Sequence, residues 1–201
     1  MLEIQPILRA HAPFEGLPMA NVPGVARMSA AAEAARYILR ADGRTARTLA
    51  MAIAVPLPPS INHFETSTAG TVVMQLGPDE WQLLVVSGGA DDIADKAEAA
   101  ASGNGLVFAL VDIGHRMASL DLTGAGVEDV LAAGCPLPLD LQRFPLGRAT
   151  RTVFLKTEIV LRRLAADRFA IDCNRSFWPY LTHHLAETIA AEAAIARHGN
   201  R

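Results

Sequence analysis

Two stretches of the chain repeat the same order of features, and this duplication is the strongest constraint on the fold. Pro56-Leu57-Pro58 ends a short predicted helix, and Pro136-Leu137-Pro138 ends another one further along. Downstream of the first, LGPDEWQLLV at 76–85 is matched by LAADRFAIDC at 164–173. Each of these strings has an acidic turn followed by an aromatic residue that opens a strand. The chain is therefore predicted to contain two copies of one unit.

Each copy is predicted to run strand, helix, hairpin, helix. In the first copy these are a strand at 35–41, a helix at 45–55, a hairpin of 71–76 with 81–87 and a helix at 91–101. In the second copy they are a strand at 116–122, a helix at 126–134, a hairpin of 152–164 with 168–173 and a helix at 176–196. Asp91 and Ser176 are suited to cap the last helix of each copy. Residues 106–112 add a strand, and 29–35 locally favours a helix.

Neither copy can close a hydrophobic core alone, so we expect two copies to pack together about a pseudo-twofold axis. The predicted class is α+β. The duplicated domain spans 29–196, with halves at 29–103 and 104–196, and is followed by a tail at 197–201. Prolines at 6, 13, 18 and 23 interrupt any apolar period, so 1–28 is predicted to be an extended arm that lies on something larger and has nothing of its own to bury.

Composition excludes several classes of protein. With 51% hydrophobic and 19% charged residues, the chain is predicted to be globular rather than disordered. No apolar run reaches the roughly 20 residues that cross a bilayer. The first residues lack the basic and apolar regions of a signal peptide, which predicts a cytoplasmic protein. A net charge of -3 argues against nucleic-acid binding.

Motifs for cofactors and metals are weak. Gly124 and Gly126 resemble the start of a dinucleotide loop, but Asp129 stands where the third glycine belongs. His183 and His184 are adjacent, so a helix would point them about 100° apart rather than onto one metal. Two cysteines fit neither a disulfide framework nor a zinc site. We therefore expect no cofactor and no metal in this chain.

Catalytic signatures are absent as well. The sequence has no G-x-S-x-G, H-E-x-x-H or S-x-x-K motif. Asp112, His115, Asp121 and Glu158 could form acid–base pairs, but polar groups on strands and turns usually lie at the surface or cap an element. We expect no catalytic residue.

Charge and aromatic residues instead suggest a partner surface. Acidic residues gather between Asp79 and Glu98, and basic residues between Asp140 and Arg175. Such asymmetry can steer a partner, although solvated surface charge explains it equally well. An aromatic cluster, Phe177, Trp178 and Tyr180, lies next to Arg175 in the sequence. Aromatic residues beside arginine are enriched at interfaces, although core packing explains this cluster at least as well. The candidate interface residues are Arg148, Arg151, Arg175, Phe177, Trp178 and Tyr180.

Five strings then carry a family resemblance: LGPDEW at 76–81, GHRMASLDLTG at 114–124, GCPLPLDL at 134–141, TRTVFLKTEIVLRR at 150–163 and DRFAIDCNRSFWPYL at 167–181. Over residues 36–185 the chain closely resembles the gamma subunit family of heterotetrameric sarcosine oxidase. That family is similar in fold to the folate-binding aminomethyltransferase, the T-protein of glycine cleavage, whose fold is itself duplicated.

The resemblance implies a small subunit that carries no cofactor. In such a complex the alpha subunit holds NAD and a folate site, beta holds FAD and FMN, and delta binds zinc. The complex oxidises sarcosine to glycine and hydrogen peroxide, and the methyl group leaves as methylenetetrahydrofolate or formaldehyde. A non-catalytic gamma subunit that scaffolds the flavin-bearing subunits is the function that the resemblance implies.

The sequence departs from the family pattern at two places, and three alternative functions stay open. A T-protein-like G-E-D-G turn is replaced by LAADRFAID at 164–172, so folate-binding residues are not carried over. Family members commonly have glycine where this chain has Leu155. The alternatives are the small subunit of N-methylglutamate dehydrogenase, a stand-alone folate-dependent aminomethyltransferase-like protein, and a self-associating protein. The amine substrate and the face that meets each partner are not predicted.

Overall fold

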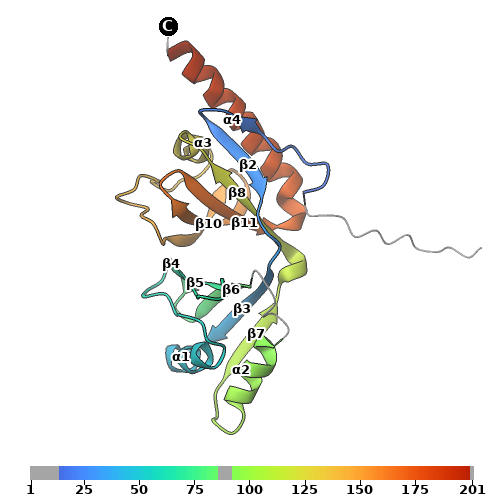
Figure 1. The fold of residues 1–201 in the computed structure, drawn as a ribbon, viewed down its shortest axis with the longest axis vertical. Helices are drawn as coiled ribbons and strands as arrows, with labels where there is room; N and C mark the ends of the chain where they lie inside the picture. The colour runs from blue at the N-terminus through green and yellow to red at the C-terminus, as the bar shows by residue number, and fades with distance from the viewer. Residues whose placement is uncertain (1–13, 86–91, 200–201) are drawn as a thin grey trace, which may run out of the picture.

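The structure is a computed structural model that describes residues 14–85 and 92–199, and it contains two antiparallel sheets stacked along the long axis of the molecule (Figure 1). The upper sheet in that view has the order β1 (Asn21–Val22), β2 (Ala26–Ala30), β8 (Met117–Thr123), β11 (Arg168–Asn174), β10 (Thr157–Ala165), β9 (Ala149–Phe154). The lower sheet has the order β4 (His63–Thr66), β5 (Val72–Gly77), β6 (Glu80–Val85), β3 (Ala35–Ala41), β7 (Phe108–Asp112).

Helices cover the outer face of each sheet. Helices α1 (Gly43–Ala52) and α2 (Ile93–Ala101) pack on the lower sheet, and α3 (Val127–Ala132) and α4 (Trp178–Gly199) pack on the upper one. Two 3-10 turns, η1 (Gly114–Arg116) and η2 (Arg175–Phe177), precede β8 and α4. This is a mixed α and β architecture with two sheets, in which each sheet buries its helix-covered face.

The two sheets are built by the same order of connections. The chain runs β3-α1-β4-β5-β6-α2 and later β8-α3-β9-β10-β11-α4. The strands then lie as β3-β6-β5-β4 in one sheet and as β8-β11-β10-β9 in the other. The predicted order of strand, helix, hairpin and helix is present in both, but each copy contains one strand more than the sequence predicts. We predicted no strand at β4, and a single strand at 152–164 where the structure has β9 and β10.

The turn at Leu155 separates β9 from β10. Phe154 pairs with Thr157, so the connection is a two-residue hairpin loop. Leu155 has a φ of 52°, a backbone conformation that favours glycine. The glycine that the family resemblance leads us to expect at this position is therefore the residue that this turn accommodates most easily.

The strand that leads each unit joins the other unit's sheet. β2 precedes β3 in the chain but pairs with β8, and β7 precedes β8 but pairs with β3. Because each unit donates one strand to the other, the two cannot separate without breaking sheet hydrogen bonds. The predicted strand at 106–112 is confirmed as β7, although it lies in the sheet of the first copy.

Residues 14–30 are more deeply built into the fold than we predicted. The sequence prediction of an arm with nothing to bury is wrong for the part described, because Val25, Ala26 and Met28 are buried in the upper core. Two glycines make room for this segment. A Cβ on Gly124 would lie 2.5 Å from the Val25 carbonyl oxygen, and the Gly126 N–H donates to that oxygen at 2.8 Å. The Gly-x-Gly string thus permits a close backbone approach.

Several predicted boundaries also shift. The segment at 29–35 forms no helix, since β2 ends and β3 begins within it. Ser176 lies inside η2, so α4 begins two residues after the predicted cap, and α4 continues to Gly199 through most of the predicted tail. Asp91, the predicted cap of the first copy's last helix, lies outside the described residues.

Candidate partner interface

Alternation along the strands decides which side chains face the helices and which face the other sheet. In β11, Phe169, Ile171 and Cys173 belong to the upper core beneath the helices. The opposite face of that strand meets the lower sheet, where a small apolar cluster joins the two sheets: Val72, Met74, Leu84, Ala149 and Val160. Polar residues on this inner face, such as Asp172, are therefore buried between the two sheets.

A cluster of buried charges occupies this inner face. Asp172 has no exposed surface, and the Nε atoms of Arg36 and Arg162 lie 3.8 Å and 3.4 Å from its carboxylate oxygens. The Arg36 guanidinium also donates to the Ser119 hydroxyl at 2.6 Å, and that hydroxyl donates to Asp172. Burial lowers the pKa of the Arg36 guanidinium, which Asp172 opposes and Arg162 reinforces.

This cluster joins strands from both sheets, since Arg36 belongs to β3 and its partners to β8, β10 and β11. We did not predict it. The signal in the sequence was Asp172, which lies among apolar residues in a strand with a neighbouring strand on each side. A carboxylate buried in such a strand needs a cationic partner.

Arg151, one of the six candidate interface residues, makes a second bridge between the sheets. Its Nη2 lies 2.5 Å from Oε1 of Glu80, and Nη2 of Arg40 lies 2.7 Å from the other carboxylate oxygen. The Glu80 side chain is buried, whereas the Arg151 side chain is 40% exposed. Arg151 therefore contributes both to the contact between sheets and to the surface.

Arg148 lies where the two sheets meet at an edge. It forms an isolated antiparallel bridge with His63, and its Nη1 lies 3.5 Å from Nε2 of that histidine. The neighbouring Phe64 N–H donates to the Gly147 carbonyl, and the Ala149 N–H donates to the Asn62 carbonyl. The edge at β4 and the start of β9 are thus held together by backbone hydrogen bonds.

The other four candidates lie together at η2 and the first turn of α4, which follow β11, and β11 is two strands away from β9 in the sheet. Trp178 is completely buried, and its ring meets Phe14 edge to face at 4.7 Å. Phe177 is 47% exposed, Arg175 is exposed, and the half-buried ring of Tyr180 lies 4.3 Å from the His184 ring. The structure therefore divides the six predicted residues into an edge group, Arg148 and Arg151, and a helix-start group.

The residues considered for acid–base chemistry do not converge. Asp121 pairs with Arg168, Glu158 lies 3.7 Å from Arg151, and Asp112 accepts from the Gly114 N–H at 2.7 Å. Across 14–85 and 92–199, no three His, Cys, Asp or Glu side chains gather as a metal site would require. No helix within that part of the chain is both long and apolar enough to span a membrane.

Comparison with known proteins gives one consistent family. A sequence model of the sarcosine oxidase, gamma subunit family matches residues 39–192. The chain is 28% identical over 146 residues to sarcosine oxidase subunit gamma of Corynebacterium sp. (strain P-1), covering 73% of this chain and 70% of that protein. Its identity to the subunit gamma of Arthrobacter sp. is 25% over 146 residues, with the same coverage of both chains.

Solved structures agree on the fold. A chain of the heterotetrameric sarcosine oxidase from Corynebacterium sp. U-96 superposes with a TM-score of 0.80 at 23% identity, over 90% of this chain and 95% of that one. The glycine cleavage aminomethyltransferase T from Bartonella henselae superposes with a TM-score of 0.60 at 16% identity, over 81% of this chain and 45% of that one. Because the family model spans most of the sequence, this chain belongs to the sarcosine oxidase gamma subunit family.

Proposed function

We propose that this chain is the gamma subunit of a heterotetrameric sarcosine oxidase, and that it positions the subunits that carry out the oxidation while performing no bond chemistry itself. The observation that carries the proposal is the family match over residues 39–192. Its partners in this proposal are alpha, beta and delta subunits. FAD, FMN, NAD, folate and zinc are assigned to those partners and none to this chain.

The proposed architecture is a duplicated domain at 29–196 whose halves, 29–103 and 104–196, are related by a pseudo-twofold axis. The equivalent strand orders of the two sheets support it, and so does the reciprocal exchange of β2 and β7. An interlocked, duplicated body of this kind suits a scaffold. Ion pairs between the two sheets help to hold the helix-covered faces of the body in fixed positions relative to each other.

The proposed contact surface includes both groups of predicted interface residues. At the helix start, Arg175, Phe177 and Tyr180 supply the accessible part, and Trp178 supports them from the core beneath. Exposed aromatic and arginine side chains over a rigid base are typical of interface hot spots. At the sheet edge, Arg148 and Arg151 extend the surface next to exposed Val153 and Leu155.

Co-expression with the three companion subunits, followed by size-exclusion chromatography, tests the proposal. We expect this chain to co-elute with them in equal amount. Phe177→Ala should weaken its retention, whereas Ile195→Ala, a matched change at an exposed apolar residue far along α4, should not. A chain that never co-elutes with the companions contradicts the proposal.

A stand-alone folate-dependent aminomethyltransferase-like protein is the second candidate, favoured by the similarity to the aminomethyltransferase fold. Calorimetry of the purified chain with tetrahydrofolate distinguishes the two. A ligand that binds the folded state raises its stability in proportion to the logarithm of ligand concentration over Kd. Saturable heat together with a raised melting temperature would favour the second candidate, and heat near zero would favour the scaffold.

A further inference from the structure

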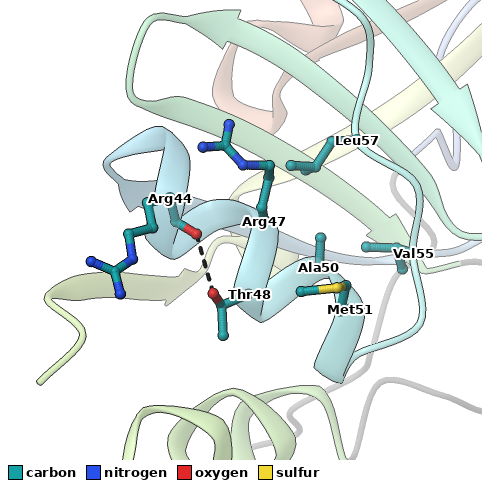
Figure 2. Close-up of a pocket in the computed structure, with 7 residues that line it drawn as sticks. All are labelled: Arg44, Arg47, Thr48, Ala50, Met51, Val55 and Leu57. Atoms are coloured by element: carbon teal, nitrogen blue, oxygen red, sulfur yellow. Dashed lines mark hydrogen bonds between the residues drawn. The ribbon is translucent and has the colours of Figure 1, made fainter. Parts of the chain in front are cut away.

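Helix α1 and the loop that follows it form a cavity of about 390 Å³ on the outer side of the lower sheet (Figure 2). We call it the α1 groove. Its lining residues come from the helix and the loop: Arg44, Arg47, Thr48, Ala50, Met51, Val55 and Leu57. In Figure 2 Met51, Ala50 and Val55 lie together at one end, and Leu57 lies beside Arg47.

Local sequence gives the groove its shape. The helix buries Thr45, Ala46, Leu49 and Ala50, which leaves Arg44, Arg47 and Met51 on the opposite, exposed face at helical spacing. The loop turns back at Ala54, whose φ is 56°, and the Val55 N–H donates to the Ala50 carbonyl at 2.9 Å. Prolines on either side of Leu57 restrict the segment further. The groove is therefore preformed.

Its apolar part is open to solvent. Met51 is 74% exposed, next to the partly buried Val55 and Leu57. A methionine side chain is flexible and polarisable, so it adapts to the shape of an apolar group laid against it. Contiguous exposed apolar surface with a polar rim is a mark of an interaction site.

The rim of the α1 groove carries two guanidinium groups, those of Arg44 and Arg47. Within the described residues, Arg44 and Arg47 form no ion pair, whereas Arg40, Arg151 and Arg168 each pair with an acidic side chain. Asp42, at the start of the helix, is engaged as its cap, accepting from the Arg44 and Thr45 N–H groups at 2.8 Å. Two guanidinium groups thus remain available to an external carboxylate.

The apolar wall and the two arginines together indicate what kind of ligand the groove binds. An apolar ligand alone would not use the arginines, and a simple anion would not use the apolar wall. A protein that is itself acidic, with a net charge of -3, is also poorly suited to the phosphates of a nucleic acid. An acidic segment of a protein with an apolar side chain between its carboxylates satisfies both features.

We propose that the α1 groove binds an acidic segment of a companion subunit, with an apolar side chain against Met51, Val55 and Leu57 and carboxylates paired with Arg44 and Arg47. This inference rests on the proposed function. It adds a contact on the lower sheet to the two groups already proposed on the upper one, so that the chain meets its companions through both sheets.

Competition for assembly tests the proposal. Wild-type chain and an Arg44→Glu/Arg47→Glu variant, carrying different tags, are co-expressed with the three companion subunits, and their ratio in the purified complex is measured. We expect the variant to be depleted at least about tenfold. When separately purified subunits are mixed instead, the depletion should be smaller in about 0.5 M salt than at low salt. Arg27→Glu/Arg116→Glu, an equal change of charge at exposed arginines elsewhere, should enter the complex like wild type.

A photo-crosslinking amino acid at Met51 identifies the occupant in the assembled complex. We expect a crosslink to a companion peptide that contains acidic residues. A crosslink to a second copy of this chain or to a peptide without acidic residues overturns the proposal, as does incorporation of the charge-reversed variant equal to that of the control. If wild-type chain itself fails to assemble, the proposed function fails and this inference with it. Assembly of wild type with no effect at the groove refutes the inference alone.

Discussion

Removing the charge of Asp172 should destabilise the protein strongly. The carboxylate is fully buried between Arg36 and Arg162, which are themselves buried. At an effective dielectric constant of about 20, the attraction across the 3.4 Å to Arg162 is about 5 kcal/mol. Asp172→Asn keeps the shape but leaves two buried guanidinium groups beside each other. Breaking a buried pair in this way costs about 3–5 kcal/mol.

Urea denaturation followed by circular dichroism measures this loss. With a typical total stability of about 5–15 kcal/mol, such a loss is a large fraction of the free energy of unfolding. The matched control is Asp121→Asn, because Asp121 also lies on an upper-sheet strand and also pairs with an arginine, Arg168. The Arg168 side chain is 48% exposed, so solvent screens that pair and the expected loss is at most about 1 kcal/mol.

The comparison has a clear refuting result. If Asp172→Asn and Asp121→Asn lower the free energy of unfolding equally, the buried cluster does not hold the two sheets together through its charge. A second variant separates charge from packing. Replacing Arg36, Arg162 and Asp172 together with apolar residues of similar volume should recover much of the stability lost in the single variant, because no buried charge is then left without a partner.

Three further predictions follow from local geometry. In urea titrations, Gly124→Ala should lower the free energy of unfolding by at least about 2 kcal/mol, because the φ of 136° and the close Val25 carbonyl both disfavour a Cβ at this position. The control is Gly70→Ala. Gly70 has a φ of 86° but open space around it, so this change should lower the free energy of unfolding by only about 1 kcal/mol. Hydrogen bonds from the Thr45 and Arg44 N–H groups, with that of Thr45 contributing most, lower the pKa of Asp42 in the folded state. Wild type should therefore be more stable than Asp42→Ala at pH 7. This advantage should be lost as the pH falls below about 4 and through the lowered pKa. Equal differences at pH 7 and pH 3 would show that the cap is not ionic. Burial raises the pKa of the Cys173 thiol to about 12, so mass spectrometry after iodoacetamide treatment at pH 8 should find Cys173 modified only in urea.

Local sequence was sufficient to predict several strands and helices. The strand predicted at 35–41 coincides with β3, and the strand at 116–122 differs from β8 by one residue at each end. Helix α1 is found two residues earlier than predicted, at the cap that Asp42 provides. These elements carry their own periodicity and their own turn residues, so a short window of sequence contains the information that forms them.

Errors arose where the outcome depended on distant parts of the chain. Residues 26–30 form a strand because β8 offers an edge to pair with, and that edge lies far away in sequence. The strand predicted at 152–164 is divided into β9 and β10 by a turn at Leu155. Leucine rarely adopts the backbone conformation of this turn, and the pairing of β9 with β10 imposes it. Tertiary pairing overrides local preference in both segments.

The candidate interface divides in the same way. Sequence composition singled out arginine and aromatic residues, but it could not say that Trp178 would lie in the core while Phe177 is exposed, since neighbouring residues at the start of a helix point in different directions. Nor could it reveal that Arg151 reaches Glu80 of the other sheet. The α1 groove depends on how the loop after the helix folds back, which no periodic pattern encodes.

By itself, the sequence determined that this is a mixed α and β protein of the sarcosine oxidase gamma subunit family, because the hydrophobic period, the turn residues and the order of the motifs can all be read along the chain. Only the tertiary structure decided which polar strand residues are buried and paired. A strand's alternation specifies that it has two faces, but whether the polar face meets water or a second sheet depends on packing between segments far apart in sequence, and at Asp172 that packing turned an ordinary polar position into a buried ion pair.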